Sequence, residues 1–111
     1  MLIVTKVFDK DCDICLHMSK HDRATFESFP DIAYQEVLLD DVINHNQDLT
    51  KLRLYQCLDK YATNSDYTID LPVYVFLEKT GKYKGHLIGA ATIQELRDKI
   101  QECLNESPQT V

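Results

Sequence analysis

The chain has 111 residues, of which 44% are hydrophobic and 27% are charged, and its formal net charge is −6. That length suits one domain with a single core, which we place at residues 1–106, followed by a frayed tail at 107–111. The 12 basic residues are scattered among 18 acidic ones, which argues against a nucleic-acid partner because phosphate binding needs clustered Lys and Arg.

The first segment, LIVTKVF at Leu2–Phe8, is rich in β-branched residues and predicts a buried strand. It lacks the basic start and the cleavage site of a signal peptide, and no apolar run approaches the roughly 20 residues of a membrane span. We therefore expect a cytoplasmic protein with no membrane partner. In that compartment four cysteines are more often catalytic, metal-bound or buried thiols than structural disulfides.

A helix is predicted after a short polar turn. From Asp13 to about Ser28 there is no Gly or Pro, and apolar residues recur at helical spacing until Pro30 ends the pattern. Ile32–Leu39 predicts a second strand, and residues 49–62 predict a second helix with one apolar stripe.

The second half of the chain predicts a hairpin and a last helix. The apolar strand Val73–Glu78 follows Leu71-Pro72, and a turn with Gly81 at a positive φ leads into the strand YKGHLIG. The last helix is expected to bury Ile93, Leu96, Ile100, Cys103 and Leu104. The order β-α-β-α-β-β-α predicts an α/β fold in which helices flank a four-stranded mixed sheet.

Cys12 and Cys15 are predicted to lie where the first strand gives way to the first helix. Unpaired backbone N–H groups and the positive end of the helix dipole favour an anion there, so we expect a lowered pKa for Cys12 and a nucleophilic thiolate. Cys15, one turn further, could attack a mixed disulfide on Cys12 and release the partner. Cys-x-x-Cys at such a junction in a βαβ pattern strongly indicates redox chemistry.

Acidic residues surround the first cysteine. Asp9, Asp11 and Asp13 bring negative charge close to Cys12, and like charge disfavours a thiolate. Asp11 and Asp13 are therefore predicted to raise the pKa of Cys12 against the helix dipole and to make the dithiol more reducing. The same acids also suit the N-terminus of a helix for purely structural reasons.

A metal site is the main alternative for this segment. Cys12, Cys15, His17 and His21 offer zinc ligands, but position 17 lies about 200° around a helix from position 15, which is poor for tetrahedral closure. We predict no metal here and expect both histidines on a helix flank, at the surface or half-buried. An iron–sulfur cluster shared by two chains is a second metal alternative.

The chain resembles a minimal thioredoxin-fold oxidoreductase of the thioredoxin and glutaredoxin superfamily. The Cys-x-x-Cys at the head of the first helix, Pro72 before the third strand and Gly89-Ala90 before the last helix occur in the family's order, from Leu2 to Leu104. The resemblance implies that Pro72 is a cis-proline that faces the dithiol. It also implies that Leu71 offers backbone hydrogen bonds to an extended substrate segment.

The sequence departs from the family pattern beside the dithiol. Thioredoxins carry Trp-Cys-Gly-Pro-Cys, whereas Asp11 replaces the Trp here and Asp13-Ile14 separate the cysteines. The family's buried acid, six residues before the first cysteine, is Lys6 in this chain. Its role as proton acceptor has either moved, to Asp40 or Asp41, or passes through water. The glutathione-binding Gly-Gly-x-x-Asp turn of glutaredoxins has no match.

The resemblance implies a cofactor-free, monomeric enzyme that reduces disulfides of protein partners, with Cys12 as nucleophile and Cys15 as resolving thiol. It further implies a target such as ribonucleotide reductase and regeneration by a thioredoxin reductase. A phage-encoded or accessory thioredoxin would suit so short a chain. Two alternatives stay open: a glutaredoxin-like enzyme that uses glutathione, and a non-enzymatic adaptor with an idle or metal-bound dithiol.

Overall fold

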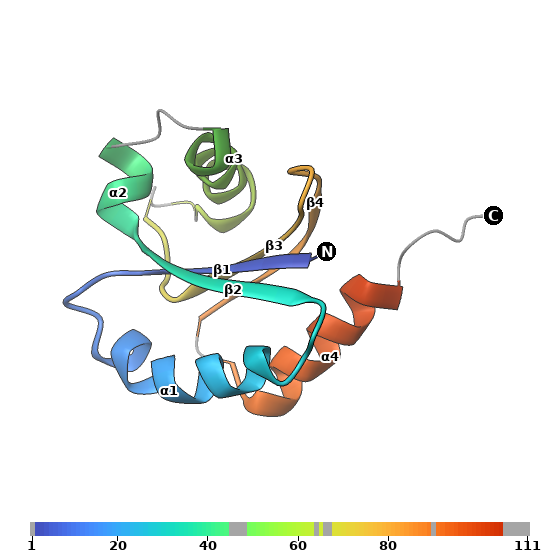
Figure 1. Cartoon of the computed structure of the whole chain (residues 1–111). Helices are drawn as coiled ribbons and strands as arrows, with labels where there is room; N and C mark the ends of the chain where they lie inside the picture. Colours follow the sequence, from blue (N-terminus) through green and yellow to red (C-terminus); the bar gives the residue numbers. More distant parts are fainter. Residues whose placement is uncertain (1, 45–48, 64, 66–67, 90, 106–111) are drawn as a thin grey trace.

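The computed structural model describes residues 2–44, 49–63, 65, 68–89 and 91–105, so the expected tail at 107–111 and Ala90 lie outside the described residues. Four strands form one sheet in the order β2-β1-β3-β4 (Figure 1). The strands are β1 (Leu2–Phe8), β2 (Ile32–Leu38), β3 (Val73–Glu78) and β4 (Tyr83–Ile88). β1 runs parallel to β2 and antiparallel to β3, and β3 runs antiparallel to β4. The predicted mixed sheet is confirmed.

Helices cover both faces of this sheet. α1 (Asp13–Glu27) and α4 (Ile93–Asn105) lie on one face, and α2 (Leu39–Asn44) and α3 (Leu49–Cys57) lie on the other (Figure 1). A single π-helical turn, η1 (Leu58–Ala62), continues α3. None of the described helices has the length and apolar character needed to cross a membrane.

The short helix α2 was not predicted. The strand expected over residues 32–39 ends at Leu38, and the chain enters a helix at once. Asp40 and Asp41 occupy the first turn, where negative charge interacts favourably with the helix dipole. Val42 then packs into the core with no exposed surface, which holds this short helix against the sheet.

The core forms one cluster on each face of the sheet. On the α1 and α4 face it contains Leu2, Val4, Phe26, Tyr74, Phe76, Leu96, Ile100 and Cys103. On the α2 and α3 face it contains Val7, Val42, Leu54, Leu58, Ala62, Val73, Val75 and Leu77. Because side chains alternate along a strand, Lys6 points to the same face as Leu2 and Val4, under α1.

The buried face of α4 is narrower than the sequence suggested. Leu96, Ile100 and Cys103 are buried, but Ile93 is 47% exposed and Leu104 is 37% exposed. The buried residues follow an i, i+4, i+7 pattern that touches the flat sheet along one line, and Leu104 is rotated about 100° from its neighbour Cys103. The prediction that Ile93 and Leu104 are buried was wrong.

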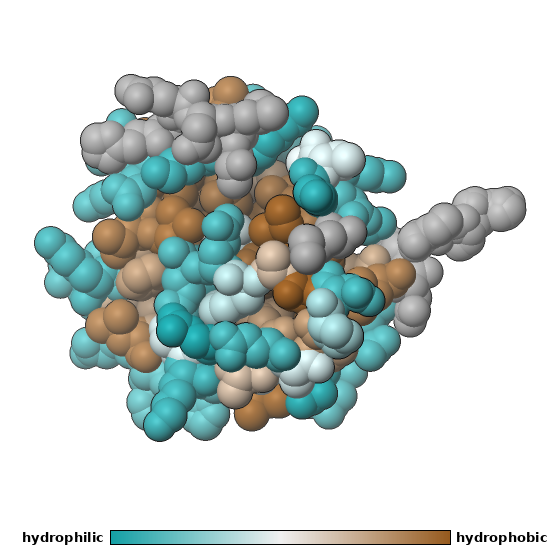
Figure 2. Space-filling model, viewed as in Figure 1, coloured by the Kyte–Doolittle hydropathy of each residue, from teal (hydrophilic) through white to brown (hydrophobic). Residues whose placement is uncertain are grey.

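Hydrophobic residues also reach the surface. On the face seen in Figure 2, hydrophilic residues cover much of the periphery, and hydrophobic ones emerge between them toward the middle. Ile14 on α1 and Ile88 at the end of β4 are 45% and 43% exposed. Single exposed side chains of this size are common in proteins. Whether Ile14 and Ile88 have a function therefore depends on where they lie relative to Cys12 and Cys15.

Phe26 offers a test of the core. It is fully buried, stacks on Tyr34 at a centroid distance of 4.7 Å and lies 6.2 Å from Tyr74. We expect Phe26→Ala to lower the free energy of unfolding by about 3–5 kcal/mol in urea denaturation, because it leaves a cavity between α1 and the sheet. Leu104→Ala, the exposed control, should cost less than about 1 kcal/mol. Equal losses would contradict the assigned packing.

Candidate active site

Cys12 and Cys15 are joined by a disulfide at the N-terminus of α1, and their Cα atoms are 5.3 Å apart. Cys12 is the N-cap residue, and its Sγ accepts a hydrogen bond from the backbone N–H of Cys15 at 3.3 Å. Cys12 is half-buried, whereas Cys15 has no exposed surface. The outer sulfur can therefore meet another molecule, and the inner sulfur can react only with the outer one.

The start of β3 lies at the same end of the sheet. Val7, near the end of β1, pairs with Val73, and Val73 in turn pairs with Ile88. The peptide bond between Leu71 and Pro72, directly before β3, is cis. The Pro72 carbonyl accepts a 2.7 Å hydrogen bond from the Gly89 N–H, which ties the residue before β3 to the residue after β4.

Gly89 has a φ of 85° at this junction. This left-handed conformation costs little for glycine and is strained for other residues. It lets the chain leave β4 and turn toward α4 at the point where its N–H reaches Pro72. The positive φ and the hydrogen bond to Pro72 therefore explain why a glycine suits position 89.

The acidic residues around Cys12 lie at the surface. Asp11 and Asp13 are exposed, and the N–H of Asp11 donates to Asp9 Oδ1 at 3.3 Å. Asp13 is the first residue of α1, in the position that the helix dipole favours for an acid. Because water surrounds these carboxylates, their action on Cys12 is screened. Their predicted tuning of Cys12 stays a prediction.

The histidines do not join the cysteines. His17 and His21 are exposed on α1, as predicted, while Cys15 faces the core. Within the part of the chain that the structure describes, no three His, Cys, Asp or Glu side chains come together in a way that could hold a metal ion.

The other two cysteines lie away from the dithiol. Cys103 is buried in the α1 and α4 cluster, as expected, and Cys57 is only half-buried. Burial raises the pKa of the Cys57 thiol, although Arg53 and Lys60 act in the opposite direction.

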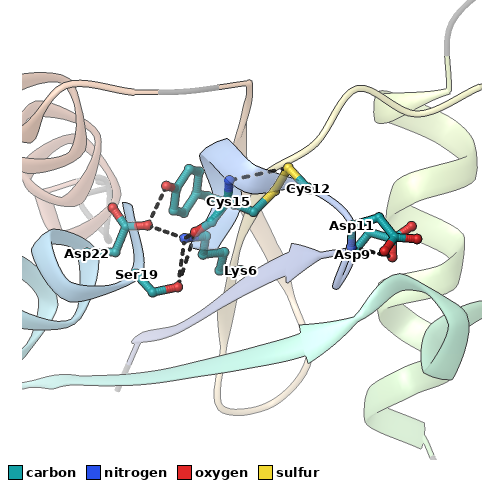
Figure 3. The surroundings of a disulfide bond; sticks show 8 residues. Lys6, Asp9, Asp11, Cys12, Cys15, Ser19 and Asp22 are labelled. Atoms are coloured by element: carbon teal, nitrogen blue, oxygen red, sulfur yellow. Dashed lines mark hydrogen bonds and ion pairs between the residues drawn. A yellow bond between two sulfur atoms is a disulfide. The ribbon is translucent and has the colours of Figure 1, made fainter. Parts of the chain in front are cut away.

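A buried charged cluster lies directly beneath the dithiol (Figure 3). The Lys6 ammonium has no exposed surface, donates to the Cys15 carbonyl oxygen at 2.6 Å and lies 2.7 Å from Asp22 Oδ2. The Tyr74 hydroxyl donates to the same Asp22 oxygen at 2.6 Å. Burial and this hydrogen bond raise the pKa of Tyr74, so its hydroxyl stays a donor.

The buried acid is therefore not one of the two proposed from the sequence. Asp40 is exposed and Asp41 is half-buried, both in the first turn of α2. Asp22 is the one acid among the described residues that is fully buried. Two signals pointed to the cluster: Lys6 interrupts an apolar strand, and Asp22 follows Cys15 by seven residues, which is the same helix face.

Comparison with known proteins gives likenesses in structure only. The sequence matches no family model and no curated protein. A thioredoxin of Fasciola hepatica is 22% identical, with 90% of this chain and 78% of that chain covered and a TM-score of 0.58. The reduced Schistosoma mansoni thioredoxin pre-protein is 18% identical, with 91% and 77% covered and a TM-score of 0.57. An exposed lipoprotein thioredoxin of Streptococcus pneumoniae is 16% identical, with 91% and 84% covered and a TM-score of 0.57.

These proteins agree with the present chain in the arrangement of its main elements. The sheet order β2-β1-β3-β4, the flanking helices and the disulfide at the head of α1 are features of this structure itself. At such low identity the likeness concerns the fold and not the activity. The chain adopts the thioredoxin fold.

Proposed function

We propose that the chain is a thiol–disulfide oxidoreductase that reduces disulfides of protein partners. The observation that carries the proposal is the Cys12–Cys15 disulfide at the N-terminus of α1, with one half-buried and one fully buried sulfur. A disulfide that only stabilised the fold would gain nothing from this asymmetry. An exchange reaction needs it, because the two sulfurs have different tasks.

In the proposed reaction the reduced protein first forms a mixed disulfide. The Cys12 thiolate attacks one sulfur of the partner's disulfide, and the other partner sulfur leaves as a thiolate that takes a proton from solvent. The Cys15 thiolate then attacks Cys12 Sγ. This step re-forms the Cys12–Cys15 bond and expels the partner's second sulfur, so the partner gains the two electrons that the dithiol loses. A separate reductant restores the dithiol, and no cofactor takes part.

The surroundings of the dithiol suit a peptide segment. An extended segment beside Leu71 can use backbone hydrogen bonds, which do not depend on its sequence. Ile14 and Ile88, 45% and 43% exposed, add apolar contacts on two sides of the sheet end that carries the disulfide. Partners of this site are therefore proteins with an accessible disulfide in an extended, partly apolar stretch. We also propose that the protein acts as a monomer and receives its electrons from a thioredoxin reductase.

The proposal is tested by disulfide reduction with insulin as substrate and dithiothreitol as reductant. Cys12→Ser should abolish catalysis because it removes the only sulfur of the pair that meets a partner. Cys15→Ser should instead accumulate a mixed disulfide on Cys12, which mass spectrometry detects. Cys57→Ser, a half-buried cysteine on α3, is the control and should keep the wild-type rate. Equal rates for wild type and Cys12→Ser would leave the fold as a non-enzymatic adaptor.

The electron donor separates the two enzyme classes. We expect a thioredoxin reductase with its nicotinamide cofactor to reduce the Cys12–Cys15 disulfide, and glutathione to do so poorly, because no Gly-Gly-x-x-Asp turn is present for glutathione. The measurement is the rate of appearance of the reduced dithiol with each donor. Efficient reduction by glutathione alone would favour the glutaredoxin-like alternative.

Asp13 provides a test of surface charge. Asp13→Asn should lower the pKa of Cys12 by less than about one unit, because the lost carboxylate is exposed and screened. The reduced form is then more stable, so the reduction potential should rise. Ultraviolet absorbance of the thiolate during a pH titration measures the pKa. Asp59→Asn, an exposed acid on η1, is the control. An unchanged titration of the Cys12 thiolate in Asp13→Asn would show that Asp13 does not act on Cys12.

A further inference from the structure

We propose that Lys6 is a positioning residue of the dithiol, whose ammonium stabilises the Cys15 thiolate in the step that resolves the mixed disulfide. The inference rests on the proposed thiol–disulfide exchange and concerns its second step. Disulfide reduction does not itself require a buried ammonium beneath the dithiol, so the presence of Lys6 there calls for a function.

The ammonium is held under the first turn of α1. Lys6 Nζ donates to the Cys15 carbonyl oxygen at 2.6 Å and lies 3.4 Å from Ser19 Oγ (Figure 3). Ser19 Oγ donates to the same carbonyl at 3.2 Å, so the turn and the lysine fix each other. Lys6 has no exposed surface, and water therefore does not screen its charge from Cys15.

The counter-charge lies on the far side of the lysine from Cys15. Lys6 Nζ is 2.6 Å from the Cys15 carbonyl oxygen and 2.7 Å from Asp22 Oδ2, and Figure 3 shows the ammonium between Cys15 and this carboxylate. The cation is thus the nearer of the two charges to Cys15. Asp22 Oδ1 is, among the described buried side chains, the one oxygen or nitrogen with no hydrogen-bond partner. The contacts of this carboxylate with Lys6 and with the Tyr74 hydroxyl are both made through Oδ2.

Other charged groups near the cluster are already engaged with one another. On β2, Glu36 pairs in register with Lys6, but its carboxylate accepts from the Tyr34 hydroxyl at 2.7 Å and from Arg23 at 3.0 Å. On α4, Arg97 lies over the Phe29 ring, 5.8 Å from its centroid. Lys6, Asp22 and Tyr74 therefore form the group of titratable side chains in direct contact beneath the dithiol.

The second step of exchange is where this charge matters. Once Cys12 carries the partner, Cys15 is the single thiol left in the pair, and it must ionise to attack. Cys15 has no exposed surface, and burial disfavours its thiolate. A fixed ammonium offsets that effect. The proton leaves through the side on which Cys12 is open to solvent, the Cys12–Cys15 bond forms, and the bond to the partner breaks.

The ammonium shifts the pKa of the Cys15 thiol in the opposite direction to an acid in the same place. A carboxylate beside Cys15 would disfavour its thiolate and could accept its proton, whereas an ammonium favours the thiolate and accepts nothing. Stabilising the thiolate also stabilises the reduced dithiol and makes the pair more oxidising. The buried Lys6 thus opposes the exposed Asp11 and Asp13, and it does so without solvent screening.

The test follows the two steps separately. Reduced protein, in a Cys57→Ser background, is mixed with dithiobis(nitrobenzoate). Attack by Cys12 releases one coloured thiolate, and attack by Cys15 on the mixed disulfide releases the second. The rate of the second release is measured against pH. In Lys6→Met with Asp22→Asn, the pH of half-maximal rate should rise by about one unit or more, because a neutral pair replaces the nearby cation.

Two further variants separate the cation from other effects. Lys99→Met with Glu102→Gln removes an ion pair of α4 at the place where Lys99 lies against Gly85 of β4, and should leave the midpoint unchanged. Asp22→Asn alone keeps the ammonium, and its midpoint is expected at or below that of the wild type. A rise in Asp22→Asn as large as in the Lys6 variant would mean that the carboxylate acts on Cys15, and would overturn the proposal. If neither variant folds, the wild-type midpoint decides the question: a midpoint well above about 8.5, the ordinary pKa of a thiol, would mean that the ammonium does not offset burial, and would overturn the proposal.

The outcomes for the two proposals are distinct. If wild-type protein releases no second thiolate, the dithiol does not resolve mixed disulfides, and the proposed function fails. If the wild type releases it and the Lys6→Met, Asp22→Asn protein does so with an unmoved midpoint, the function stands and the role of Lys6 is rejected. As a second readout, the equilibrium with dithiothreitol should shift severalfold toward the disulfide in that variant.

Discussion

The attachment of α1 to the sheet governs both the fold and the site. Three groups on α1, the Cys15 carbonyl, the Ser19 hydroxyl and the Asp22 carboxylate, converge on one ammonium from the central strand. These contacts set the height and rotation of the helix, and hence the place of Cys12 at its end. Removing one member of a buried ion pair typically costs about 3–5 kcal/mol, whereas replacing both by neutral groups can cost little. Such a pair is therefore better understood as fixing an arrangement than as adding stability.

Local patterns were sufficient for most of the fold. Apolar runs bounded by polar turns located all four strands, and Cys-x-x-Cys with the later Pro72 and Gly89 indicated the thioredoxin-like order. The helix α2 was not predicted because the hydrophobic pattern of six residues is too short to distinguish a helix from the end of a strand. Its formation depends on Val42 meeting residues of η1 and β3, which are distant in sequence.

The candidate site was predicted in part. Cys12 and Cys15 could be predicted from their spacing and from their place between a predicted strand and a predicted helix, since both lie on one local segment. Asp22 could not, because a carboxylate on a helix is usually solvated, and only the tertiary contact with Lys6 makes burial tolerable. The identity of a buried pair depends on two positions at once, so neither Lys6 nor Asp22 can be interpreted without the other. The roles of Leu71 and Pro72 rest on resemblance and on the proposed reaction.

The unequal exposure of the two sulfurs has a kinetic consequence. In the proposed cycle, Cys12 must contact the electron donor and also the protein that receives the electrons, because Cys15 cannot be reached from outside. The two molecules therefore compete for one small surface and cannot be bound together. Such a protein works as a diffusing shuttle with alternating encounters, and an excess of either partner in the wrong redox state inhibits the other. Its throughput is set by the concentrations of both partners and not by a channel between them.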